Sequence, residues 1–293
     1  KKRRISLGMV LIYIALTILF VVTFFPFWNI FVLSLNDAND TIRGGILFWP
    51  RVFTLDSYKA VLTDQELISA LKVTLLRTAI GVPCNLVGVT TLAYALSQHD
   101  LPGRKFFNLL FVFTMYFNGG LIPTYMIIKW LGLIDRFAVY ILPGFYNVYW
   151  MILVRTYMES LPKSMIESSR IDGANDFQIF TKIVLPSCTP VLATIGLFSA
   201  IGHWNAWYDS YIYTNKNSLK TLQAVLVKIL NQYQTGKMMT AAQQMAAQAK
   251  KIPVSSESIR MAVTMVTTIP IILAYPFVQK YFIKGIYKII ISF

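Results

Sequence analysis

Long apolar runs separated by short polar stretches dominate the chain. Six runs are long enough to cross a bilayer as helices, which takes roughly 20 mostly apolar residues. Their approximate bounds are 9–35, 67–97, 106–130, 137–158, 191–213 and 259–282. Strand-like alternation over about ten residues is absent, and lipid admits only helices or closed barrels. The pattern therefore predicts an all-α membrane protein with six transmembrane helices.

Basic residues indicate which loops face the cytoplasm, because Lys and Arg accumulate in short cytoplasmic loops. Four of them precede the first run, which is too long for a signal peptide and is expected to be retained. Others lie in the second-to-third and fourth-to-fifth loops and after the sixth run: Arg104, Lys105, Lys163, Arg170, Lys182, Lys280, Lys284 and Lys288. With six spans these positions share one side, so both termini are expected in the cytoplasm.

Composition agrees with a membrane protein. Hydrophobic residues make up 56% of the 293 residues and charged residues only 14%, whereas soluble domains carry about 25% charged residues. The net charge of +14 would suggest nucleic acid in a soluble protein. Here we attribute it to cytoplasmic helix ends beside anionic lipid headgroups, and we expect no nucleic acid partner. Cys84 and Cys188 form neither a disulfide framework nor a metal-site spacing, so no metal is expected.

The stretch 161–190 is too polar to span and too patterned to be a linker. Ser164 and Glu167 have the spacing of a capping box that opens a short helix. Asp172-Gly173 would end that helix, since glycine tolerates the left-handed conformation. A second helix is expected from Asn175 or Asp176, with Leu185-Pro186 ending it. We predict a helix–turn–helix projection suited to docking on a soluble partner.

This stretch resembles the EAA loop of permeases from binding-protein-dependent ABC importers. Five positions of that motif are matched, by Glu167, Gly173, Ile183, Leu185 and Pro186, while Ser168 and Ser169 replace its two alanines. The resemblance implies a type I importer-like permease whose cytoplasmic coupling loop docks on an ABC ATPase dimer. The implied coupling residues are Glu167, Ser168, Ser169, Asp172, Gly173, Ala174, Phe177, Phe180, Leu185 and Pro186.

The resemblance extends over nearly the whole chain. Residues 93–97 and 101–104 are similar to the second permease of maltose-type importers. Residues 118–125, 203–205 and 276–282 resemble the oligosaccharide and complex-polysaccharide branch, which includes alginate-importer permeases. The resemblance implies one permease domain over 1–293 in the inner membrane of a bacterium. It also implies a non-identical second permease, alternating access, and an extracytoplasmic binding protein that delivers oligosaccharides, with acidic (alginate or uronate-type) ones as the finer interpretation.

The sequence carries no enzyme signature. Gly236-Lys237 lacks the upstream glycine and the hydroxyl residue of a P-loop, and His99 and His203 are the only histidines. We therefore expect no catalytic residue and no cofactor bound by this chain, with ATP and Mg²⁺ used by the partner ATPase. An autonomous membrane channel and a membrane-embedded enzyme are the alternatives. A channel would not need a docking projection, and an enzyme would need a nucleophile, base or metal ligands.

The loop 214–258 is expected on the extracytoplasmic side and exceeds the usual length of a structureless loop. Residues 238–251 are rich in helix formers and too polar to enter lipid. The loop is either solvated or, as the resemblance implies, in contact with the binding protein. Candidate contacts are Gln232, Met238, Gln243, Gln244 and Lys250.

Aromatic and amide side chains mark a possible sugar path, since sugars stack on aromatic rings and hydrogen-bond to amides. The candidates are Tyr116, Asn118, Tyr146, Asn147, Tyr149, Trp150, Trp204, Asn205 and Trp207. The alternative is an interfacial aromatic belt with interhelical polar contacts. Lys72 and Arg77 lie in the outer half of the second run. They would either snorkel to the interface or face a cavity and attract an acidic saccharide.

Overall fold

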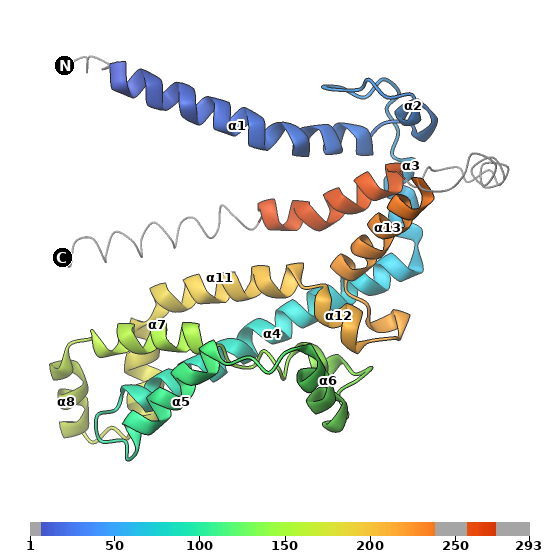
Figure 1. Cartoon of the computed structure of the whole chain (residues 1–293). Helices are drawn as coiled ribbons and strands as arrows, with labels where there is room; N and C mark the ends of the chain where they lie inside the picture. The colour runs from blue at the N-terminus through green and yellow to red at the C-terminus, as the bar shows by residue number, and fades with distance from the viewer. Residues whose placement is uncertain (1–6, 238–256, 274–293) are drawn as a thin grey trace. The chain divides into compact units, whose positions relative to one another are not determined.

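The structure is a computed structural model that describes residues 7–237 and 257–273. Apart from one bridge between Asn36 and Phe53, the regular secondary structure of these residues is helical. The all-helical prediction is confirmed. The helices, in chain order (Figure 1), are α1 (Leu7–Ser34), α2 (Ala38–Ile42), α3 (Asp56–Thr63), α4 (Gln65–Ser97), α5 (Arg104–Tyr116), α6 (Leu121–Trp130), η1 (Phe137–Tyr140), α7 (Val148–Glu159), α8 (Lys163–Ile171), α9 (Asp176–Ile179), η2 (Phe180–Val184), α10 (Leu185–Ser187), α11 (Thr189–Asn205), α12 (Tyr208–Tyr213), η3 (Asn217–Leu219) and α13 (Leu222–Lys237), followed by a helix over 257–273.

Two described helices are long and apolar enough to cross a membrane unaided. They are Gly8–Ser34, within α1, and Gln65–Ser97, which is α4. Two bent pairs meet the same test together: α5 with α6, which turn by 117°, and Asp176–Ser187 with α11, which turn by 78°. Of the sixth predicted run, the structure describes a helix as far as residue 273.

The third apolar run is not one continuous helix, contrary to expectation. It breaks between α5 and α6 at the sequence Asn118-Gly119-Gly120. The side chain of Asn118 accepts the Gly120 N–H at 2.8 Å, and Gly120 has φ +87°, a conformation that only glycine adopts readily. A local side-chain turn thus replaces the helical hydrogen bonds.

The fourth run is also interrupted, between η1 and α7. Its break packs closely on α4, where the Asn85 side chain donates to the Gly144 carbonyl at 2.9 Å. A Cβ atom on Gly88 would lie 2.4 Å from the Phe145 carbonyl oxygen, so this approach requires glycine. The side chain of Asn147 then accepts the Trp150 N–H at 3.1 Å and caps α7. Proline and glycine at 143–144 favour this break.

The fifth run is divided, contrary to expectation, and the loop after it forms helical structure. The fifth run divides into α11 and α12 at Ala206-Trp207. The first part of loop 214–258 is not structureless, because it forms η3 and α13. Residues 238–256 lie outside the described part of the chain.

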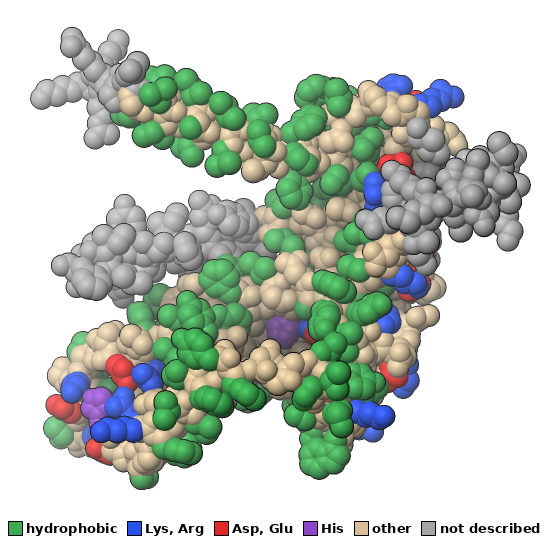
Figure 2. Space-filling model, in the orientation of Figure 1, with side chains coloured by type: hydrophobic (Ala, Val, Ile, Leu, Met, Phe, Trp, Pro, Cys, Tyr) green, Lys and Arg blue, Asp and Glu red, His purple; other side chains and the backbone are tan. Residues whose placement is uncertain are grey.

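The chain divides into two compact units. Unit 1 comprises residues 1–68 and 226–270, and unit 2 comprises residues 69–225 and 271–293. Within unit 1, the segment after α1 packs on the C-terminal end of that helix, while residues 8–24 of α1 are exposed. Within unit 2, buried side chains of α4, α7 and α11 form one core with Ile179 and Val184. Charged side chains gather at the end of unit 2 that carries α8 (Figure 2).

Candidate coupling loop and outer polar cluster

The first helix of the coupling loop (residues 161–190) begins earlier than expected. Pro162 is the N-terminal residue that flanks α8, and no side chain caps the helix there. Ser164 therefore lies inside the first turn, and the predicted capping box between Ser164 and Glu167 is wrong. The fixed backbone angle of proline is suited to starting a helix, which explains the shift.

The turn between the two short helices agrees with the prediction for glycine. Gly173 has φ +82°. Its N–H donates to the Arg170 carbonyl at 3.1 Å, and the Ala174 N–H donates to the Ser169 carbonyl at 3.0 Å. This pair of bonds is the Schellman arrangement that ends helices. A Cβ on Gly173 would meet no atom within 4 Å, so backbone conformation, rather than space, requires glycine.

The second helix starts where predicted and ends later. Asn175 and Gln178 form a reciprocal capping box, with bonds of 2.8 and 3.0 Å. The helix does not end at Leu185-Pro186 but continues through the π-helix η2 to Ser187. Pro186 has no N–H, and the wider π spacing lets the preceding Leu185 N–H reach the Phe180 carbonyl. Helical structure is thereby carried past the proline.

The second helix is anchored on the body of unit 2. Ile179 and Val184 are buried in the core formed by α4, α7 and α11. The rings of Phe180 and Tyr94 lie 4.8 Å apart, and the Tyr94 hydroxyl donates to the Asp176 carbonyl at 3.3 Å. Burying an aliphatic side chain such as that of Ile179 or Val184 stabilises the structure by about 2–3 kcal/mol relative to leaving it exposed. The second helix of the loop is thus packed on the core that α4, α7 and α11 share.

Charged side chains join the helix ends beside the loop. Arg104, which begins α5, lies 2.5 Å from Glu159 at the end of α7 and donates to the Leu96 carbonyl of α4 at 2.8 Å. Arg155 pairs with Glu159 at 3.5 Å and hydrogen-bonds to Asn108. Sequence reasoning did not single out Arg155 or Glu159. Their i, i+4 spacing at the end of an apolar run was the available signal.

The predicted coupling residues divide by exposure. Exposed are Glu167, Ser168, Asp172, Gly173, Phe177 and Pro186, whereas Ser169, Ala174, Phe180 and Leu185 are half-buried. Ile171, which was not predicted, is 86% exposed and Phe177 is 73% exposed. Ile166 packs on the core. Ile171 lies five residues further along α8, so its side chain points well away from the face that carries Ile166. The outer face of the loop thus combines two apolar side chains with the carboxylates of Glu167 and Asp172.

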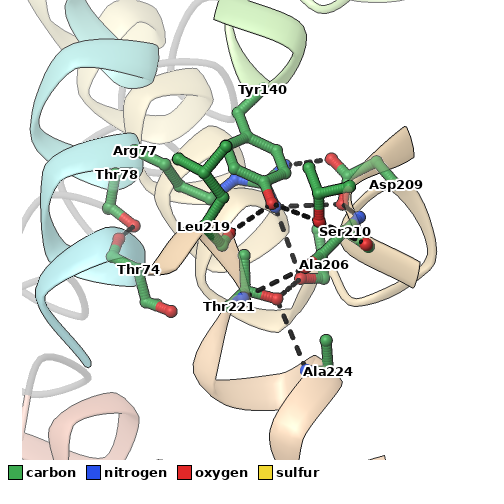
Figure 3. A network of polar contacts seen from close by, with 11 residues as sticks. Thr74, Arg77, Thr78, Tyr140, Ala206, Asp209, Ser210, Leu219, Thr221 and Ala224 are labelled. Atoms are coloured by element: carbon green, nitrogen blue, oxygen red, sulfur yellow. Dashed lines mark hydrogen bonds and ion pairs between the residues drawn. The ribbon is translucent and has the colours of Figure 1, made fainter. Parts of the chain in front are cut away.

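Arg77 does not snorkel, contrary to the first of the two predictions for it. Its side chain is 4% exposed and forms a fork with Asp209, through Nη1 to Oδ1 at 3.1 Å and Nη2 to Oδ2. The guanidinium carbon lies 4.6 Å from the centre of the Tyr140 ring. Figure 3 shows this arrangement. No local pattern could identify the partner, since Asp209 lies 132 residues away. Lys72 is exposed.

Hydroxyl groups extend this contact into an outer polar cluster, defined as Thr74, Arg77, Tyr140, Asp209 and Thr221 (Figure 3). The Tyr140 hydroxyl donates to the Leu219 carbonyl at 2.6 Å. Thr221 donates to the Ala206 carbonyl at 3.2 Å, and Thr74 accepts the Leu222 N–H at 2.9 Å. The start of the 214–258 loop is therefore fixed on α4.

Asp135 fastens the same region from another loop. It has φ +56° and accepts the N–H groups of Asn215 at 2.5 Å and Lys216 at 3.1 Å. The backbone hydrogen bonds from Asn215 and Lys216 lower the pKa of the Asp135 carboxyl below its ordinary value. The clasp thus favours the charged carboxylate.

The sugar-path candidates fall in three places along unit 2. Tyr116 and Asn118 lie at the α5–α6 break; Tyr146, Asn147, Tyr149 and Trp150 lie at the start of α7; Trp204, Asn205 and Trp207 lie at the α11–α12 junction. Trp204 is buried and Trp150 half-buried, while the others are exposed. Asn205 is joined by Gln223, which was not predicted, at 3.3 Å. These positions remain predictions for the sugar path.

The predicted binding-protein contacts lie largely outside the described residues. Gln232 lies in α13, whereas Met238, Gln243, Gln244 and Lys250 fall within 238–256. Within the described ranges, no group of three or more His, Cys, Asp or Glu side chains could hold a metal ion.

Comparison with known proteins covers nearly the full chain. The family described as "Binding-protein-dependent transport system inner membrane component" matches residues 2–288. The polygalacturonan/rhamnogalacturonan transport system permease protein YtcP of Bacillus subtilis is 35% identical, with 94% of each chain covered. Protein LplC of the same organism is 34% identical over 90% of this chain and 88% of its own. A chain from the crystal structure of a bacterial ABC transporter involved in import of the acidic polysaccharide alginate is 30% identical, covering 96% of this chain and 99% of its own, with a TM-score of 0.86.

Proposed function

Because this chain belongs to the family of binding-protein-dependent transport system inner membrane components, we propose that it conducts uronate-containing oligosaccharides through an ATP-driven importer. It is an inner-membrane permease subunit of an ABC importer and not itself an enzyme. Its partners are a second permease, an ATPase and an extracytoplasmic binding protein. ATP and Mg²⁺ would be used by the ATPase.

The relatives carry the substrate proposal. One, at 35% identity, is described as transporting polygalacturonan and rhamnogalacturonan, and another, at 30%, belongs to an importer of the acidic polysaccharide alginate. Both similarities cover more than nine-tenths of this chain. Arg77 does not support an acidic substrate, because Asp209 neutralises its charge. Lys72, which is exposed, is the cation in α4 that could attract a carboxylate.

The coupling loop is proposed to transmit the closure of the ATPase. Ile171 and Phe177 offer exposed apolar surface, and Glu167 lies nearby on α8 as a partner for a basic residue. The base of the loop is buried through Ile179 and Val184, so a force on the exposed face would reach α4 and α7. This combination of an exposed docking face with a buried base is the observation that supports the coupling role.

The proposed topology follows from that role. The coupling loop and the Arg104–Glu159 pair would face the cytoplasm together with both termini. The outer polar cluster, Asp135 and the loop 214–258 would face the opposite side. Alternating access would then expose a cavity between the two permeases to each side in turn. Residues 232–250 would contact the binding protein.

Uptake into cells tests the substrate proposal. Cells that express the complete importer would receive a labelled galacturonate or alginate oligomer, or the same oligomer with its carboxyl groups reduced. We expect uptake of the acidic oligomer only, and loss of uptake when the ATPase is inactivated. Equal uptake of the reduced oligomer would refute acidic selectivity. Uptake that persists without ATP hydrolysis would favour a channel.

A further inference from the structure

A hairpin at residues 44–53 of unit 1 folds back along α1. Gly44 and Gly45 have φ +73° and +75° and reverse the chain after α2. The hairpin closes where the Asp37 N–H donates to the Val52 carbonyl and the Thr54 N–H to the Leu35 carbonyl, both at 2.9 Å. In Figure 1 this segment runs back beside α2, next to the end of α1.

The tip of the hairpin, residues 46–50, lies beside residues 25–29 of α1. The rings of Phe48 and Phe25 lie 5.8 Å apart, as do those of Trp49 and Trp28. Phe25 and Trp28 precede Ser34, the last residue of α1, by nine and six positions. At 1.5 Å per residue, the tip therefore reaches about 9–14 Å back along the helix.

That depth corresponds to the edge of the hydrocarbon layer. The apolar helix Gly8–Ser34 has 27 residues, and about 20 suffice to cross the hydrocarbon core. Twenty residues counted from Gly8 end at Phe27, close to the residues that the tip contacts. Aromatic side chains concentrate at this boundary in membrane proteins.

Part of the polar backbone of the tip is satisfied by side chains of α1. Three successive carbonyls, those of Ile46, Leu47 and Phe48, accept hydrogen bonds from α1 side chains. Asn29 donates to the first two at 3.0 and 3.2 Å, and Trp28 donates to the third at 3.1 Å. In water these carbonyls would need no such partners, whereas in lipid each unpaired one is costly. The segment 46–50 carries no charge.

Three side chains of the tip point outward, while that of Ile46 is buried. Trp49 is 74% exposed and Phe48 60% exposed, and Leu47 is exposed too. Arg51, next in the chain but nearer the hairpin base, pairs with Asp40 at 3.5 Å and donates to the Gly44 carbonyl. Apolar side chains at the tip and a charged pair at the base match the polarity gradient from acyl chains to headgroups.

We infer that residues 46–50 form an interfacial membrane wedge, which inserts among lipids of the leaflet where α1 ends and fixes the height of α1 in the bilayer. Residues 8–24 of α1 are exposed within the chain. The wedge adds a lipid contact at the C-terminal end of α1, which is the end that packs on other residues of unit 1. The occupant is the lipid interface rather than a second protein.

Depth-dependent quenching tests the wedge in the assembled importer in lipid nanodiscs. Cys84 and Cys188 are replaced by alanine, and Trp49→Cys is labelled with an environment-sensitive NBD dye. Nitroxide lipids carry the quencher at the headgroup, at carbon 5 or at carbon 12. We expect stronger quenching by the headgroup and carbon-5 lipids than by the carbon-12 lipid, with blue-shifted emission. Lys59→Cys, whose native side chain is 74% exposed in α3, serves as the aqueous control and should respond to iodide.

Three outcomes would overturn the inference. Quenching at position 49 by iodide and by no lipid would place the tip in water. Protection from both quenchers would show that a partner protein covers it. A maximum with the carbon-12 lipid would place the tip in the bilayer interior. Leu47→Cys repeats the test at a second position if the Trp49 variant does not assemble, and ATPase activity of each labelled complex verifies assembly.

Discussion

The ion pair between Arg77 and Asp209 is expected to stabilise unit 2 in an asymmetric way. Replacing Asp209 by leucine leaves a guanidinium whose side chain is 4% exposed without its carboxylate. Replacing Arg77 by methionine leaves a carboxylate that is 25% exposed and can regain water. We therefore expect Asp209→Leu to be clearly more destabilising than Arg77→Met.

The magnitude follows from the geometry. At the 3.1 Å separation of Nη1 and Oδ1, an effective dielectric constant of about 20 gives an attraction of about 5 kcal/mol before desolvation. Breaking a buried pair by removing one partner costs about 3–5 kcal/mol. Because Asp209 is partly exposed, we expect about 3 kcal/mol for Asp209→Leu. The double variant should recover a large part of that loss, since no unpaired charge remains.

The assay is reversible unfolding of the purified chain in mixed detergent micelles, with helix content measured by circular dichroism. The coupling free energy comes from the cycle of wild type, both single variants and the double variant. A coupling of about 3 kcal/mol is expected. Simple additivity would refute the view that Asp209 neutralises Arg77. Equal losses for the two single variants would refute the asymmetry expected from their burial.

Four further predictions address the coupling loop and the outer loops. Glu167→Ala should lower ATPase coupling without unfolding α8, because no capping box is lost. The control is Ser164→Ala, an exposed α8 position outside the predicted coupling residues, and normal uptake in the Glu167 variant would contradict the docking role. Gly173→Val should destabilise the turn by about 1–2 kcal/mol and uncouple the ATPase, since Gly173 has φ +82°. Gly173→Asn should retain more coupling, and full coupling in the valine variant would be the contrary result. Replacing residues 238–249 by a Gly/Ser linker should reduce stimulation by the binding protein but leave ATPase binding intact, and unchanged stimulation would identify the segment as a solvated loop. The pKa of Asp135 is lowered in the folded protein, so the stabilisation that its carboxylate provides is present above the ordinary Asp pKa of about 4 and is lost as pH falls through the folded-state pKa. The difference in melting temperature between wild type and Asp135→Asn should therefore disappear in acid. A difference that does not depend on pH would refute the charge-based clasp.

Local signals in the sequence predicted the turn of the coupling loop and the start of its second helix. Gly173 and Asn175 have side-chain and backbone properties that act within a few residues, so their turn and cap could be expected. The Ser164–Glu167 capping box failed because Pro162 starts the helix two residues earlier. The helix continued past Pro186 because a π-helix accommodates the missing N–H, which no spacing rule anticipates.

Contacts between distant residues escaped prediction. Arg77 could be recognised as a charge within an apolar run, but Asp209 lies on another helix, and only the fold brings the two together. Apolar periodicity likewise found the runs but not their interruptions at 117–120 and 141–147. The hydrogen bonds that hold the wedge could not be predicted for the same reason, because Asn29 and Trp28 donate to carbonyls about 20 residues away.

We propose that this permease subunit couples binding-protein delivery of an acidic oligosaccharide to ATP hydrolysis by a partner. The most direct measurement is the ATPase rate of the complete importer in proteoliposomes, with the binding protein empty, loaded with a uronate oligomer, or loaded with its carboxyl-reduced counterpart. We expect stimulation by the uronate-loaded protein alone, and loss of this stimulation with Phe177→Ala in the exposed face of the coupling loop. A hydrolysis rate that is unaffected by the binding protein and by this substitution would contradict it.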